Sequence, residues 1–94
     1  MESIVSGKIP KPYSNTEEVK NQLQELGYAV SETSNYFEFK KEGSLENALE
    51  EVSPICEEAG LSKEKELTLE ETYPDMAMSS VYDHGRIVRK LPGY

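Results

Sequence analysis

The residues best suited to chemistry stand together near the end of the chain, at Asp83-His84-Gly85-Arg86. His84 is the single histidine of the sequence, and an acid, an imidazole and a guanidinium are groups used in general acid–base catalysis. Neighbouring residues of an extended strand point to opposite faces, so Asp83 and His84 can form a pair only in a turn. The tetrapeptide therefore has two interpretations. One is a small enzyme or ligand-binding site that uses Asp83, His84 and Arg86, and the other is the corner of a β-hairpin.

Cross-strand pairing favours the hairpin. With His84-Gly85 as a two-residue loop, opposite charges face each other at Asp83 and Arg86, and apolar residues face apolar residues along both strands. Such a loop requires a positive φ at His84, which histidine adopts more readily than most residues. A short helix over residues 74–84 is the competing prediction. We therefore predict a structural role for the tetrapeptide and expect no enzymatic activity.

Other site chemistries lack their sequence patterns. There is no phosphate-binding glycine motif, no calcium loop and no pair of histidines at zinc-binding spacing. Cys56 is the single cysteine, which excludes an internal disulfide and a thiolate zinc site, and it falls among apolar positions where a buried core residue is expected. We expect no cofactor and no metal, a cytoplasmic location, and no membrane segment because no long apolar run is present.

Two helices are predicted from the spacing of the apolar residues. The first covers residues 15–26, with Ser14 as the N-cap and Glu17 completing a capping box. The second begins at Ser44 and contains Pro54, which either kinks one helix or starts a second short one. The outward side of this second helix is acidic.

The strands complete an α+β fold, predicted as one domain over residues 1–94. Residues 1–13 form either a weak first strand or an extended arm, and residues 75–94 form a C-terminal hairpin extension. The architecture expected is a two-layer sandwich, an antiparallel sheet with two helices on one face, and a ferredoxin-like βαββαβ order is consistent with it. The remaining predicted strands are 28–32, 36–41 and 66–73.

The charge of the chain is concentrated in its middle. The net charge is −8, and residues 44–71 carry nine acidic and two basic residues, whereas residues 72–94 carry two acidic and three basic residues. Direct binding to a nucleic-acid backbone is disfavoured by this distribution, since phosphates require a basic face. An acidic surface instead permits docking on a basic protein surface.

These observations predict a small non-enzymatic protein-binding or regulatory domain, of accessory, inhibitor or immunity type, with a basic protein surface as its partner. A nucleic-acid mimic that inhibits a DNA- or RNA-handling protein is the alternative. The sequence leaves open whether the chain forms a homodimer. Acidic residues of the second helix and aromatic or basic residues of exposed sheet positions are the predicted contacts. These partner-binding candidates are Glu46, Glu50, Glu51, Glu57, Glu58, Tyr36, Tyr82 and Arg89.

Overall fold

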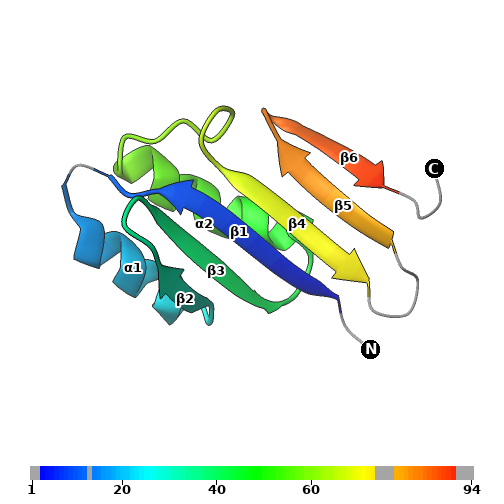
Figure 1. Ribbon diagram of the computed structural model, residues 1–94, viewed down its shortest axis with the longest axis horizontal. Coiled ribbons are helices and arrows are strands. Elements are labelled where there is room, and N and C mark those ends of the chain that lie inside the picture. The colour runs from blue at the N-terminus through cyan, green and yellow to red at the C-terminus, as the bar shows by residue number, and fades with distance from the viewer. Residues whose placement is uncertain (1–2, 13, 74–77, 91–94) are drawn as a thin grey trace.

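A computed structural model describes residues 3–12, 14–73 and 78–90, and shows an antiparallel sheet with two helices against one face (Figure 1). The first six elements follow in the order β-α-β-β-α-β, and a hairpin comes after them. The predicted two-layer α+β arrangement is therefore confirmed. The elements are β1 (Ile4–Pro10), α1 (Thr16–Glu25), β2 (Ala29–Glu32), β3 (Tyr36–Glu42), α2 (Leu45–Glu58), β4 (Thr68–Tyr73), β5 (Met78–Asp83) and β6 (Arg86–Lys90).

The N-terminal segment is a central strand of the sheet. The strand order is β2-β3-β1-β4-β5-β6, and β1 pairs antiparallel with both β3 and β4. Of the two predictions for this segment, the strand is confirmed and the arm is wrong. Gly7 lies at the centre of this strand, where the Phe39 ring and the Leu69 side chain occupy the space that a larger residue would need. A Cβ at Gly7 would clash with the Phe39 ring and lie 2.7 Å from Cδ2 of Leu69.

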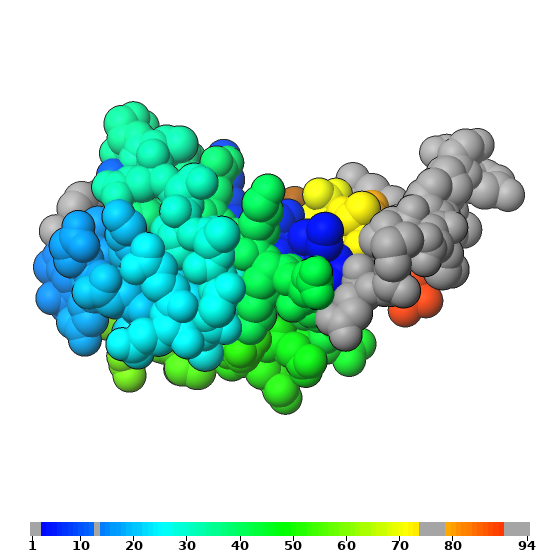
Figure 2. Space-filling model, turned by 90° about the horizontal axis from the view of Figure 1, so that it is seen from below, coloured from blue at the N-terminus to red at the C-terminus, as the bar shows by residue number. Residues whose placement is uncertain are grey.

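The core lies between the sheet and the two helices. Figure 2 shows α1 and α2, in blue and green, along one side of the molecule. α1 buries Val19 and Leu23 against the sheet, and α2 buries five residues. Each strand alternates, so one face carries the core side chains and the other faces away from the helices. The largest fully buried side chains are Phe37, Phe39, Ile9, Leu23, Leu45, Leu67, Leu69, Val5, Val52 and Cys56.

The helix ends differ in part from the predictions. Asn15, with φ of 61°, is the N-cap of α1 and makes no side-chain capping bond, so the predicted capping box from Ser14 to Glu17 is wrong. The α2 N-cap is confirmed, because the N–H of Asn47 donates to the Ser44 hydroxyl at 3.2 Å. α2 also continues through Pro54, which is exposed, so the prediction of two short helices is wrong. Neither helix is long and apolar enough to cross a membrane among the residues described.

The C-terminal hairpin has the predicted register. Asp83 lies opposite Arg86 across a turn in which His84 has φ of 52° and Gly85 has φ of 76°. The competing helix is therefore wrong over residues 78–83. The rest of the predicted extension, residues 75–77 and 91–94, lies outside the described residues.

Candidate functional site

Four glutamates of α2 lie on the exposed surface of the helix. Glu46, Glu50 and Glu57 are spaced by four and seven residues, which places them on one side of the helix, and Glu58 flanks them. All four are exposed, and α2 contains no basic residue. None of them takes part in an ion pair within the described part of the chain. We call these four residues the acidic stripe.

The acidic stripe is unfavourable for the isolated helix. Glu46 and Glu50 are like charges at i, i+4, an arrangement that destabilises a helix by about 0.2–0.5 kcal/mol. Glu57 and Glu58 occupy the last turn, where the helix dipole is negative and where no basic residue compensates. Only Glu46, in the first turn, has a favourable interaction with the helix dipole, so most of the stripe opposes the stability of the helix.

Glu51, the fifth predicted residue on α2, has an internal role. Its carboxylate lies 3.1 Å from Nζ of Lys41 and accepts a hydrogen bond from the Tyr28 hydroxyl at 3.4 Å. The same ammonium donates to the carbonyl of Leu26 at the end of α1, at 2.9 Å. Burial of Tyr28, together with the charge of Glu51, raises the pKa of the Tyr28 hydroxyl well above its ordinary value. Glu51 thus joins α2 to β3 and α1.

Tyr82 was expected at an exposed position, and this expectation is wrong. It lies opposite Leu69 on the core side of the sheet, and only 4% of its surface is exposed. Its hydroxyl donates to the carbonyl of Lys63 at 3.0 Å, so the segment after α2 covers it. Burial, and then the charge of Glu64, raises the pKa of the Tyr82 hydroxyl. The sequence did not show which face of the hairpin this segment would cover.

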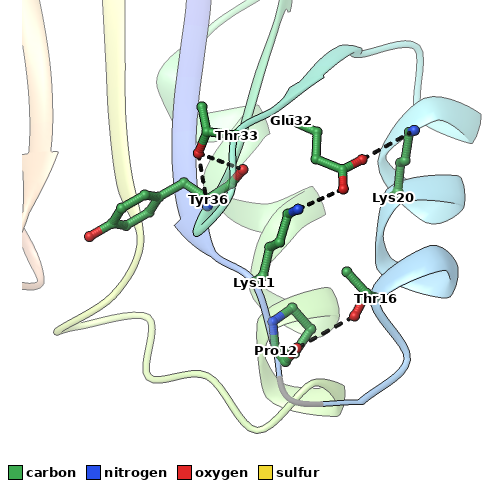
Figure 3. Close-up of polar contacts among 7 residues, drawn as sticks. All are labelled: Lys11, Pro12, Thr16, Lys20, Glu32, Thr33 and Tyr36. Atoms are coloured by element: carbon green, nitrogen blue, oxygen red, sulfur yellow. Dashed lines mark hydrogen bonds and ion pairs between the residues drawn. The ribbon is translucent and has the colours of Figure 1, made fainter.

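The face of the sheet away from the helices carries Tyr36, which is 40% exposed. Nζ of Lys8 lies 4.3 Å from the centroid of its ring, a cation–π contact between neighbouring strands. Figure 3 shows the Tyr36 ring pointing away from the cluster formed by Lys11, Glu32 and Lys20. Tyr36 is therefore available for contact, on the side of the sheet opposite the acidic stripe.

A depression of about 500 Å³ lies on this open face. Several of the residues that line it are small. Two lysines and two glutamates are among the lining residues, so the depression has no single sign of charge that would select an ion. Across the described ranges, no three His, Cys, Asp or Glu residues converge to hold a metal. Its lining includes Ser6, Ala29, Ser31, Thr68, Lys8 and Lys40.

The residues first considered for catalysis do not form an enclosed site. Nδ1 of His84 lies 3.1 Å from Oδ1 of Asp83, but 79% and 53% of the two side chains are exposed. Water screens a contact of this kind. Cys56 is fully buried, as predicted, and burial raises the pKa of its thiol to about 11, which keeps it protonated at neutral pH.

Two ion pairs hold the end of β2 against the rest of the domain. Glu32 lies 2.6 Å from Nζ of Lys11 and 3.4 Å from Nζ of Lys20, as drawn in Figure 3. The hydrogen bond from Lys11 is the main cause of a lowered pKa of Glu32. This cluster fixes β2 to α1 and to the segment after β1.

Arg89 is exposed on β6, at the opposite edge of the sheet from β2. Apart from the buried Tyr82, the structure therefore separates the predicted partner-binding residues into three places, the helix layer, the open face and the β6 edge. Comparison of the chain with protein-family models, with curated proteins and with solved structures found no match.

Proposed function

We propose that this chain is a non-enzymatic protein-binding domain that places the acidic stripe of α2 on a basic surface of a partner protein, in an accessory, inhibitory or immunity-type role. The observation that carries the proposal is the stripe itself, four exposed glutamates on a helix that contains no basic residue, none of them in an ion pair among the described residues. A basic partner would relieve the repulsion that the free domain retains.

The helix presents these charges in a fixed arrangement. Its opposite side packs on the sheet through residues such as Ala48, Val52 and Ile55, so the carboxylates project from a rigid element. An array of one sign also accelerates encounter with a surface of the other sign, and it does so most strongly at low salt. Binding of this type should therefore weaken steeply as the salt concentration rises.

The test is a neutralised stripe, the variant E46Q/E50Q/E57Q/E58Q, compared with a matched variant E17Q/E18Q/E25Q/E38Q. The control removes the same number of charges from exposed positions outside the stripe. Proteins captured by the wild-type chain from its native cells are identified and purified, and their dissociation constants are measured at two salt concentrations. We expect the stripe variant to bind at least about tenfold more weakly and with less salt dependence. Equal loss in both variants, or no loss in either, would contradict the proposal.

Competition with duplex DNA in the same experiment distinguishes a nucleic-acid mimic from other protein-binding domains. If the purified partner is a DNA- or RNA-binding protein and duplex DNA displaces the domain from it, the stripe occupies a nucleic-acid site. If duplex DNA has no effect, the basic surface that the stripe contacts is not a nucleic-acid site.

A further inference from the structure

The last strand of the C-terminal hairpin, β6, extends the sheet beyond the helices. In Figure 1, α2 lies behind the middle of the sheet, whereas β6 is its outermost strand. Among the described residues, β6 pairs with β5 and with no strand on its other side. Its outer edge therefore presents backbone N–H and C=O groups that another strand can use.

The side chains of this edge follow a regular pattern, Arg86-Ile87-Val88-Arg89. Ile87 lies opposite the buried Tyr82 and so projects to the helix side of the sheet, whereas Val88 projects to the open face. Both are 52% exposed, more than any other large apolar residue among those described. Each face of the edge therefore offers one apolar side chain and one arginine.

We propose that the edge of β6 binds an extended segment of a partner protein whose sequence runs acidic–apolar–apolar–acidic. The Asp83–Arg86 pair closes a two-residue turn, so alternate backbone groups of β6, beginning with Ile87, face outward. A segment added there continues the ladder, as in other strand-addition complexes. Its acidic residues lie opposite Arg86 and Arg89, and its apolar residues lie opposite Ile87 and Val88, the pairings that stabilise neighbouring strands.

Charge excludes a second copy of this chain as the occupant. β6 contains three basic residues, Arg86, Arg89 and Lys90, and no acidic one, so pairing two copies of β6 would place six basic residues along one seam. Like charges across a strand pair are destabilising. The other edge, β2, is four residues long, and Glu32, its single acidic residue, is already held by Lys11 and Lys20.

This site is separate from the acidic stripe in position and in sign. The stripe repels an acidic segment, while the edge of β6 attracts it. The same basic residues hinder association with neutral strands, so the edge selects by charge as well as by backbone pairing. The inference therefore extends the proposed function to a second, independent contact.

The probe is the capped peptide Thr-Glu-Val-Val-Glu-Thr, with Thr-Lys-Val-Val-Lys-Thr as the control of equal apolar content. Titration of the isotope-labelled domain is followed by backbone amide shifts. We expect the acidic peptide to shift the amides of residues 86–90 and of β5, and the basic peptide to bind at least about tenfold more weakly. No shift at millimolar peptide, or shifts centred on another surface, would overturn the proposal.

Four variants test where the peptide binds. R86Q/R89Q should lose about tenfold in affinity for the acidic peptide, while K8Q/K40Q, which removes two lysines from exposed positions of β1 and β3, should change it by less than twofold. I87P removes an outward N–H and should abolish binding with both arginines kept. The neutralised stripe should bind the peptide as the wild type does. Unchanged shifts elsewhere in the spectrum verify the fold, and equal binding by R86Q/R89Q and wild type would refute the site.

Discussion

Glu71 on β4 accepts a hydrogen bond at 2.8 Å from the backbone N–H of Leu45, the first residue of α2. The carboxylate is buried, and its second oxygen accepts a hydrogen bond from the Ser3 hydroxyl at 2.7 Å. The first N–H groups of a helix have no partner within the helix and carry a partial positive charge. Glu71 therefore supplies the anion that completes the start of α2 and joins that helix to the sheet.

Replacement of Glu71 by alanine should destabilise the domain by about 2–4 kcal/mol, because a charge-assisted bond is lost and the Leu45 N–H is left buried without a partner. Glu71→Gln keeps an acceptor and should cost about 1 kcal/mol. The measurement is urea unfolding followed by circular dichroism. The control is Glu70→Ala, at the exposed neighbouring position, which should change the free energy of unfolding by less than about 0.5 kcal/mol. Similar losses at positions 70 and 71 would contradict the capping role.

Glu70 and Glu71 also show which features of the fold could not be predicted from the sequence. The alternation of β4 places Glu71 on the same face as the buried Leu69 and Glu70 on the opposite face. What the sequence does not show is that the N-terminus of α2 lies beside Glu71, because that contact joins segments far apart in the chain. The hairpin register was predictable because turn geometry and cross-strand charges act between residues close in the chain. Tyr82 was misplaced for the opposite reason, since the segment that covers it comes from before β4. For the candidate site, helical spacing was enough to locate the acidic stripe, but it did not reveal that Lys41 already engages Glu51.

Gly7→Ala should destabilise the domain by about 2–3 kcal/mol. The added methyl has no room between Phe39 and Leu69, and overpacked cores lose stability by forcing side chains from their rotamers. Gly60→Ala is the comparison, because no atom lies within 4 Å of a Cβ there and only the positive φ of 76° opposes the change. It should cost about 1 kcal/mol. Thermal unfolding of both variants tests the difference, and equal stability of Gly7→Ala and wild type would show that β1 does not need a glycine.

Cys56 should react with a thiol reagent at pH 8 roughly a thousandfold more slowly in the native domain than in urea, because the side chain is buried and must be exposed by opening. The raised pKa also has a consequence for stability. The unfolded chain loses its thiol proton near an ordinary pKa of 9.0, but the folded chain retains it to about 11. This stabilising contribution is complete below pH 9 and is lost as the pH rises through 11. Stability should therefore fall more steeply over that interval in the wild type than in Cys56→Ala.

Substitutions at His84 test whether the hairpin turn depends on the backbone conformation of this residue or on its imidazole. The residue has φ of 52°, a conformation that asparagine adopts more readily and that a β-branched residue resists. His84→Asn should therefore leave stability unchanged or raise it by a few tenths of a kcal/mol, whereas His84→Val should lower it by about 1–2 kcal/mol. Unfolding measurements give this order, with Glu38→Val as an exposed strand control that lacks the positive φ. If both His84 variants lost the same stability, the imidazole and not the backbone conformation would be what the turn requires. If His84→Asn kept its stability but abolished partner binding, the imidazole would be part of a binding site.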